Sequence, residues 1–393
     1  MLIITNINLK IDYKNLSLIS DNDLENYIIF KKERNEIMEL KNKLSLIKVE
    51  WDNVKKITNP YELIHITNQK KNNNSIALKE PVSRSYFKMI EILNKYKLLY
   101  DINEIDTKRY EIQKKEKINI LCLAEGPGGF IESILEKKGE DIGLIYGFTL
   151  NSNNNKNIPT WSKLINKLEQ EKIRVIYGDL YELEDIKILL NNLKDLEIEL
   201  VTADGGFDYS IDFNLQEQLS YRIIYSEIII GLKVLKKGGS LVVKIFDIYT
   251  VLTIKYIMIL KNYFEEVYID KPLTSRGANS EKYIICKGYK SIEKEIIEIL
   301  INNIENFNKD IIDINGIELL PEIVKEIEKV NEKYLSSQKE IFEKTLKYIN
   351  IRPSTKDYIE MIKTQTYNAY EWCINNNIAI NKESSYYKKY IDK

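Results

Sequence analysis

The strongest constraint on the fold of this chain is an alternation of short apolar runs with amphipathic segments between about residues 78 and 290. Seven apolar runs predict strands, and they read INILCLA, IGLIYGF, KIRVIYG, EIELVTA, GSLVVKIF, FEEVYI and KYIICKGY. Between them, amphipathic segments predict helices that begin near Phe130, Asn157, Leu180, Asn214 and Tyr249. Several runs are almost continuously apolar, as expected for strands that helices cover on both faces. The pattern therefore predicts an α/β domain built on a parallel sheet.

The two flanking regions have a different texture. The N-terminal flanking region contains a charged stretch with apolar residues every three or four positions, YIIFKKERNEIMELKNKLSLIKVEWDNV. The loop-like segment NQKKNNNS follows it. The last is rich in Ile, Glu and Lys at helical spacing and ends in a further helical segment, YIEMIKTQTYNAYEWCI. We therefore predict a mostly helical N-terminal extension over residues 1–75, the α/β domain over 76–290 and a helical C-terminal region over 291–393.

Composition excludes several classes of protein. A chain of 393 residues with 44% hydrophobic residues can bury a sizeable core, and 58 basic against 59 acidic residues give no net charge that favours nucleic acid. The three cysteines, Cys122, Cys286 and Cys373, are far apart and argue against a disulfide framework or a zinc site. With the single histidine His65, neither a multi-histidine metal site nor a histidine-based triad is indicated. No signal peptide and no uncharged run of about 20 apolar residues is evident, so we expect a soluble intracellular protein without a metal.

A glycine turn interrupts the first strand candidate of the core in ILCLAEGPGGFIE, which runs from Ile120 to Glu132. A strand, a glycine turn and a helix in this order place backbone N–H groups and a helix N-terminus beside a ligand. The spacing matches neither GxGxxG nor GxxxxGK[ST], and Pro127 lacks an N–H that could donate to a phosphate. The turn therefore suits a group without phosphate, such as the methionine part of S-adenosylmethionine. The alternative is a tight turn whose glycines serve packing.

Two further strand ends offer polar groups. After the second strand, GFTLN carries no acidic residue for a ribose, so Thr149, Asn151 or main-chain groups would have to contact it. After the third strand, Asp179 in YGDLYE could accept a hydrogen bond from an adenine amino group. It could equally be the N-cap of the helix that follows, and the sequence leaves the two open.

Four charged residues stand at informative positions. Asp204 follows ELVTA, at the carboxyl end of the fourth strand, where open α/β sheets bind ligands. Lys244 ends the apolar SLVVKIF, where a lysine is costly unless it is paired or faces a cleft. Glu281 opens EKYIICKGY, and Lys88 lies in the predicted helix SRSYFKMIEIL. Each taken singly has a structural explanation, such as a cap, a snorkelling side chain or a solvated charge.

Taken in chain order with the glycine turn, these four residues resemble the Lys-Asp-Lys-Glu tetrad of the FtsJ-like (RrmJ-type) RNA 2′-O-methyltransferases. The segments AEGPGGF, GFTLN, VTADGGFD, GGSLVVKIF and KPLTSRGANSEKYIICKGY are most similar to the Adrift-type cap methyltransferases and their relatives in large DNA viruses. Cys122 and Ala124 depart from the bacterial branch, which often carries Asp and Gly there. This departure argues against ribosomal RNA as the substrate.

The resemblance implies a Rossmann-like S-adenosylmethionine-dependent methyltransferase sheet with helices on both faces. It implies an enzyme that methylates ribose 2′-hydroxyls in the 5′ cap region of mRNA. The alternatives are a ribosomal or transfer RNA 2′-O-methyltransferase and a non-catalytic RNA-binding subunit of a capping complex. Capped mRNA is the expected partner, together with an unidentified capping-complex protein, and the expected location is cytoplasmic. A viral origin, in host cytoplasm or virion, agrees with the bias toward Ile, Asn, Lys and Tyr.

The same resemblance implies roles for individual residues. The catalytic residues are Lys88, Asp204, Lys244 and Glu281. Residues that contact the methyl donor are Glu125, Gly126, Pro127, Gly128, Gly129, Phe130, Thr149 and Asp179. Residues that contact RNA are Arg84, Ser275, Arg276 and Asn279. Two mechanisms stay open at this point: Lys244 deprotonates the 2′-hydroxyl, or it only orients that hydroxyl and stabilises the developing alkoxide.

Overall fold

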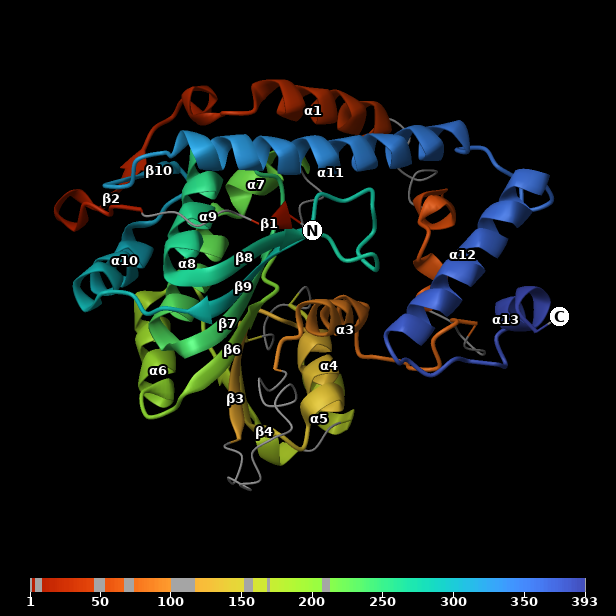
Figure 1. Cartoon of the computed structure of the whole chain (residues 1–393), viewed down its shortest axis with the longest axis horizontal. Helices are drawn as coiled ribbons and strands as arrows, with labels where there is room; N and C mark the ends of the chain where they lie inside the picture. The colour runs from red at the N-terminus through yellow and green to blue at the C-terminus, as the bar shows by residue number, and fades with distance from the viewer. Residues whose placement is uncertain are drawn as a thin grey trace, which may run out of the picture.

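The computed structural model describes residues 2–3, 9–45, 54–66, 74–99, 117–151, 158–167, 170–206 and 213–392. Its centre is an eight-stranded sheet with the order β1-β8-β9-β7-β6-β3-β4-β5 (Figure 1). The strands are β1 (Leu2–Ile3), β3 (Ile118–Leu123), β4 (Ile142–Thr149), β5 (Ile173–Tyr177), β6 (Ile198–Ala203), β7 (Leu235–Ile245), β8 (Phe264–Asp270) and β9 (Lys282–Tyr289). All seven predicted strands are therefore confirmed, and β1 adds a short edge strand.

The direction of the strands differs from the prediction at one side of the sheet. Strands β3 to β7 pair in parallel, whereas β9 lies between β7 and β8 and runs antiparallel to both. The segment between β8 and β9 contains no helix, and a connection of this kind joins antiparallel neighbours. Hydrophobicity alone does not report strand direction. The prediction of a parallel sheet is therefore confirmed for β3 to β7 and wrong for the pairings of β9.

The helices are α1 (Lys31–Ser45), α3 (Ser85–Tyr96), α4 (Gly129–Lys138), α5 (Ser162–Lys167), α6 (Leu183–Leu193), α7 (Gln216–Leu219), α8 (Tyr221–Val234), α9 (Val251–Tyr263), α10 (Lys294–Asn306), α11 (Pro321–Lys347), α12 (Lys356–Asn375) and α13 (Ser385–Tyr390). Short 3-10 helices are η1 (Tyr13–Asn15), η2 (Leu24–Tyr27), η3 (Glu62–Ile64), η5 (Gln170–Lys172) and η7 (Phe213–Leu215). Asn157, the predicted start of one helix, lies outside the described residues, and α5 begins at Ser162.

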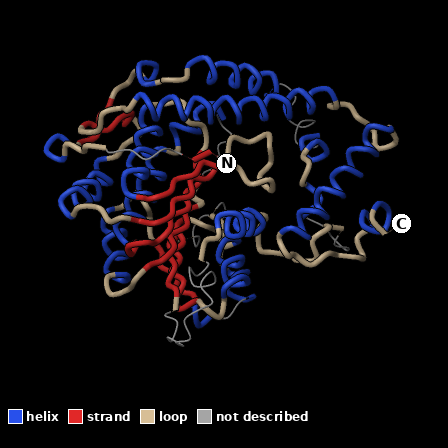
Figure 2. Tube along the Cα trace, viewed as in Figure 1, coloured by secondary structure: helices blue, strands red, loops and turns tan. Residues whose placement is uncertain are grey.

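Helices cover both faces of the sheet, as predicted (Figure 2). Along β3, Leu121 and Leu123 join one apolar cluster with residues of α6, α8 and α9. Ile120 and Cys122 join the other cluster, with residues of α3 and α4. This division follows from the two-residue period of a strand, which sends alternate side chains to opposite faces.

The two flanking regions meet each other. Strand β10 (Ile311–Asn315) pairs antiparallel with β2 (Ser17–Ser20), and helix α1 lies along α11 (Figure 1). These strands were missed, because two short apolar runs among long helical segments carry little periodicity of their own. Of the charged stretch predicted as helical, α1 covers residues 31–45, while 46–53 lie outside the described residues. Most of NQKKNNNS also lies outside them.

No helix in the described part of the chain has both the length and the apolar character needed to cross a membrane.

Helix α9 is central to the packing. Nearly all its side chains are buried, because it packs against β8 on one side and against β10 and α11 on the other. Ile257, in the middle of the helix, is fully buried. The flanking regions thus complete the core on this face of the sheet.

We expect Ile257→Ala to lower the free energy of unfolding by about 2–5 kcal/mol, because it leaves a cavity where the surroundings are packed on all sides. Urea unfolding followed by circular dichroism measures this. Ile359→Ala is the matched control, since Ile359 on α12 is 42% exposed, and it should change stability by no more than about 0.5 kcal/mol. Equal effects of the two substitutions would contradict the packing described here.

Candidate active site

The register of the parallel strands brings Asp204 and Lys244 together. Ala203 on β6 lies opposite Val243 on β7, so the next residue of each strand projects from the same carboxyl edge of the sheet. The Lys244 Nζ lies 3.3 Å from Asp204 Oδ1 and donates a hydrogen bond of 2.7 Å to the Asp204 carbonyl oxygen. Both side chains are largely buried, at 11% and 15% exposure.

The other two predicted residues form a second pair beside the first. Helix α3 carries Lys88, whose Nζ lies 2.7 Å from Oε1 of Glu281, the residue immediately before β9. The sequence distance between them is large, and only the packing of α3 beside the start of β9 makes the contact. The structure therefore brings all four predicted tetrad residues to one place.

Tyr283 connects the two pairs, and the sequence analysis missed it. Its hydroxyl lies 2.9 Å from Asp204 Oδ1 and 3.3 Å from Glu281 Oε1. It lies opposite Lys244 in the β7–β9 register and two residues after Glu281. That spacing of two along a strand was the available signal, because it places both side chains on one face.

The charges of the site determine its protonation states. Burial alone would lower the pKa of Lys244, but the carboxylates of Asp204, Glu281 and Glu227 outweigh it and raise that pKa above its ordinary value. Burial would raise the pKa of Glu281, but Lys88 and Lys244 hold it below its usual range. Burial also raises the pKa of Tyr283, so its hydroxyl stays protonated and can donate to either carboxylate. Lys244 is therefore a cation and Glu281 an anion at neutral pH.

A cavity of 710 Å³ opens beside the tetrad, a size suited to a cofactor. Its lining includes three residues predicted to contact the methyl donor, Gly126, Thr149 and Asp179. It also includes tetrad members and one residue predicted to contact RNA: Asp204, Lys244, Glu281 and Asn279. The glycine turn and the reactive charges thus share one pocket.

The remaining residues of the glycine turn are used for packing. A Cβ at Gly128 would lie 2.4 Å from a methyl carbon of Leu164, and one at Gly129 would lie 2.2 Å from the Ser85 hydroxyl. Phe130 is fully buried against Tyr283, and Pro127 does not line the cavity. Both explanations apply to Gly126, which lines the cavity and where a Cβ would lie 2.8 Å from the Pro159 carbonyl oxygen. Gly128 and Gly129 serve close packing.

Glu125 lies directly before Gly126 and is buried. Among the described residues neither of its carboxylate oxygens has a hydrogen-bond partner. Burial raises the pKa of Glu125 well above its ordinary value, and the charge of nearby Asp204 adds to this. A cationic group entering the pocket would stabilise its ionised form.

Of the two roles that the sequence left open for Asp179, the N-cap of α6 is wrong. The Asp179 Oδ1 accepts a 2.9 Å hydrogen bond from the Tyr181 amide, which holds the turn before α6. The N-cap of α6 is Glu182, so Asp179 is not the cap itself. It also lines the cavity and remains available there as an acceptor.

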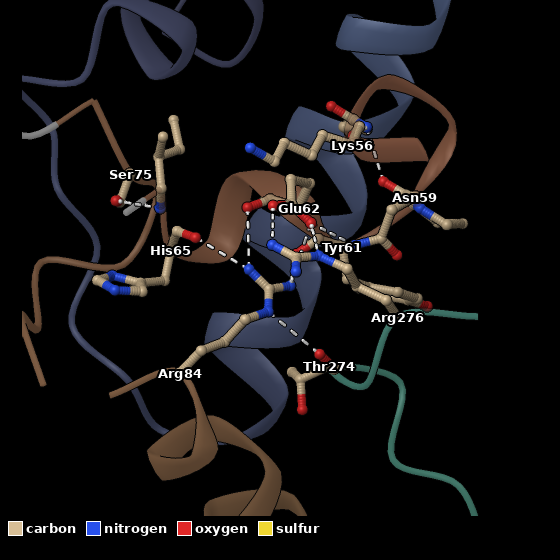
Figure 3. Close-up of polar contacts among 12 residues, drawn as sticks. Lys56, Asn59, Tyr61, Glu62, His65, Ser75, Arg84, Thr274 and Arg276 are labelled. Carbon is tan, nitrogen blue, oxygen red and sulfur yellow. Dashed lines mark hydrogen bonds and ion pairs between the residues drawn. The ribbon is translucent and has the colours of Figure 1, made fainter. Parts of the chain in front are cut away.

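The four residues predicted to contact RNA are all engaged by other parts of the protein, although Asn279 is exposed and lines the cavity. Ser275 is buried, and its hydroxyl lies 3.0 Å from Glu281 Oε1, while Asn279 Oδ1 accepts from Lys271. Arg84 and Arg276 both turn toward Glu62 of the N-terminal region (Figure 3). Nothing near either arginine in the sequence predicted this partner, which comes from a distant part of the chain.

Comparison with known proteins identifies the family of this chain. A model of the FtsJ-like methyltransferase family matches residues 81–289, a range that contains the whole tetrad. The "Cap-specific mRNA (nucleoside-2'-O-)-methyltransferase 1" of Mus musculus is 33% identical over 227 residues, 53% of this chain and 27% of that protein. The protein of the same name from Xenopus laevis is 30% identical over 257 residues, 61% of this chain and 30% of that protein.

The protein of that name from Trypanosoma brucei brucei is 31% identical over 175 residues, 44% of this chain and 47% of that protein. This chain thus spans between about a quarter and half the length of the curated relatives it matches. Since the family match itself covers more than half of the chain, this chain belongs to the FtsJ-like methyltransferase family.

Proposed function

We propose that this chain is an S-adenosylmethionine-dependent RNA ribose 2′-O-methyltransferase that acts on the 5′ cap region of mRNA. The observation that carries the proposal is the shared pocket, in which Asp204, Lys244 and Glu281 face the same cavity as Gly126 and the strand ends. Membership in the family and the names of the relatives support the reaction and the substrate.

The pocket fits the methyl donor on several counts. Gly126 lines the cavity, Thr149 and Asp179 offer polar groups at neighbouring strand ends, and the buried carboxyl of Glu125, directly before Gly126, has no hydrogen-bond partner among the described residues. When bound, S-adenosylmethionine supplies an electrophilic methyl group on sulfur. Gly126, Glu125, Thr149 and Asp179 are the residues that would hold it.

The protonated state of Lys244 favours the second of the two mechanisms. As a cation it can donate a hydrogen bond to the ribose 2′-oxygen and stabilise negative charge that develops there. Asp204 accepts a hydrogen bond from the hydroxyl, fixes its direction and takes up the proton that the oxygen loses as it is methylated. Tyr283 holds the Asp204 carboxylate, and Glu281 holds Lys88. Positioning of the oxygen in this preformed site supplies much of the rate.

Replacing Lys244 by alanine should reduce transfer of labelled methyl groups to RNA by about 100-fold to 1000-fold or more, because the cation at the reacting oxygen is lost. Calorimetry should show that the variant still binds S-adenosylmethionine. Lys236→Ala is the matched control, since Lys236 lies near the other end of β7 and pairs with Glu199. Turnover by Lys244→Ala at the rate of the unsubstituted chain would contradict both mechanisms.

The pH dependence distinguishes the two roles of Lys244. Its pKa is raised, so it stays protonated throughout the neutral range and somewhat above it. We expect kcat to be level between about pH 7 and 9 under saturating substrates, because the working form of Lys244 is then constant. A neutral lysine acting as the base would instead make kcat rise about tenfold for each pH unit over this range.

Capped RNA should be the preferred substrate. Incubation with labelled S-adenosylmethionine and matched capped and uncapped transcripts should label the capped one, with the methyl group in an alkali-resistant linkage near the 5′ end. Alkali resistance follows because a methylated 2′-oxygen cannot attack the neighbouring phosphate. Label in ribosomal or transfer RNA alone would favour the first alternative, and RNA binding without transfer would favour the non-catalytic subunit.

Finer expectations belong to this proposal. Capped mRNA as partner follows from the proposed reaction, a capping-complex protein would dock on the regions outside residues 81–289, and a cytoplasmic site of action goes with a viral origin. The relatives named above come from animals and a trypanosome, so a viral origin rests on the resemblance and the composition alone.

A further inference from the structure

Both arginines that the sequence assigned to RNA converge on one carboxylate. Glu62, in η3 of the N-terminal region, lies 2.7 Å and 3.0 Å from the Nη2 and Nε atoms of Arg276 (Figure 3). The Nη2 of Arg84 lies 3.9 Å from Glu62 Oε2, and Asn59 donates to the same oxygen at 2.7 Å. Two oxygens facing the fork of a guanidinium give a directional pair that holds Arg276 in one orientation.

Arg84 is tied to the same segment through the main chain. Its guanidinium donates to the carbonyl oxygens of Tyr61 and His65 at 2.9 Å each and to that of Glu62 at 3.4 Å. Its Nε donates to the carbonyl oxygen of Thr274 at 3.3 Å. Arg84 thus joins the N-terminal segment to the loop between β8 and β9, which we call the catalytic loop (residues 271–281).

The positions of these arginines relative to the tetrad are informative. Arg84 is the N-cap residue of α3 and precedes Lys88 by about one helical turn. Arg276 lies in the catalytic loop that ends at Glu281. Glu62 therefore contacts the immediate neighbourhood of both members of the Lys88–Glu281 pair without touching either of them.

Helix α12 supports this arrangement from outside the family match. Gln365 is buried and donates to the carbonyl oxygens of Lys56, Ile57 and Asn59, which fixes the segment that carries Glu62. Burial would raise the pKa of Glu62, but Arg276 and Arg84 hold it below its ordinary value, so the carboxylate is ionised.

We propose that Glu62 is a positioning residue, which holds the catalytic loop and the start of α3 so that Glu281 meets Lys88. The inference rests on the proposed methyl transfer for its activity test. It assigns a task to the regions outside residues 81–289: η3 supplies the carboxylate and α12 fixes η3. A displacement of the loop by about 1 Å is enough to slow such a reaction by about 100-fold.

The test compares Glu62→Gln with the unsubstituted chain in steady-state kinetics on capped RNA. Glutamine keeps the size of the side chain but loses the charge that orients Arg276. We expect kcat to fall about 10-fold to 100-fold, with the KM for RNA and the affinity for S-adenosylmethionine unchanged. An unchanged kcat would overturn the inference. A lower KM for RNA at unchanged kcat would also overturn it. Glu62 would then only compete with RNA for an arginine side chain.

The matched control is Glu36→Gln. Glu36 on α1 pairs with Lys339 on α11, so it also joins the two flanking regions, and among the described residues neither side chain forms a hydrogen bond or ion pair with the catalytic loop. We expect wild-type kinetics from this variant. A loss of kcat equal to that of Glu62→Gln would overturn the inference, because any weakening of the flanking regions would then suffice.

A double variant separates positioning from RNA contact. Arg276→Gln should fold even if Glu62→Gln does not, because its side chain is 31% exposed. If Arg276 acts only through Glu62, the double variant should lose no more kcat than the worse single variant. Additive losses, with a raised KM for RNA in Arg276→Gln, would overturn the inference and make Arg276 a direct RNA contact.

A structural measurement keeps this inference separate from the proposed function. Amide hydrogen exchange over residues 271–281 should become faster in Glu62→Gln and stay unchanged in Glu36→Gln, because only the first loses a contact that holds the loop. If the unsubstituted chain methylates no RNA, the proposed function fails, and the exchange result alone decides whether Glu62 holds the loop. Unchanged exchange in Glu62→Gln would overturn the inference in either case.

Discussion

The burial of two lysines and two carboxylates at one edge of the sheet is the constraint on which the rest of the site depends. Each of these charges would be costly to remove from water alone. They are tolerated because Lys244 lies beside Asp204, Lys88 lies beside Glu281, and the Tyr283 hydroxyl lies between the two carboxylates. The compensation works only if three strands and one helix keep their relative positions. A packed, two-faced sheet supplies that rigidity, since apolar clusters fill both of its sides.

The regions outside the family match contribute to the same rigidity. Glu91 on α3 accepts hydrogen bonds from the backbone amides of Leu273 and Thr274 and from the indole of Trp372 on α12. A carboxylate on the helix that carries Lys88 thus holds the catalytic loop, and α12 holds that carboxylate. Burial raises the pKa of Glu91, while these donors oppose the rise. Together with the contacts of Glu62, this gives the loop two attachments that reach α12, and Gln338 on α11 adds another by donating to the carbonyl oxygen of Ala278.

The glycine turn shows which features of the site the local sequence predicts and which it does not. The run from strand to turn to helix was predictable because apolar periodicity and glycine are local signals. Which glycine faces a ligand was not, because that depends on Leu164 and Ser85, which come from other elements and occupy the space beside Gly128 and Gly129. The same limit applies to Arg84 and Arg276. A charged residue in a loop is usually solvated, and nothing near either arginine in sequence announces Glu62 as its partner.

The sequence by itself determined the seven strands of the core, the helices on both faces, the carboxyl-edge positions of Asp204 and Lys244, and the order of the four charged residues. These follow from periodicity and from the rule that parallel strands present their carboxyl ends to one side. Only the tertiary structure decided the antiparallel direction of β9, the β2–β10 pair, the bridging place of Tyr283 and the inward turn of the arginines. Each of these depends on contacts between residues far apart in the chain, whose partners are set by packing and by the compensation of buried charge.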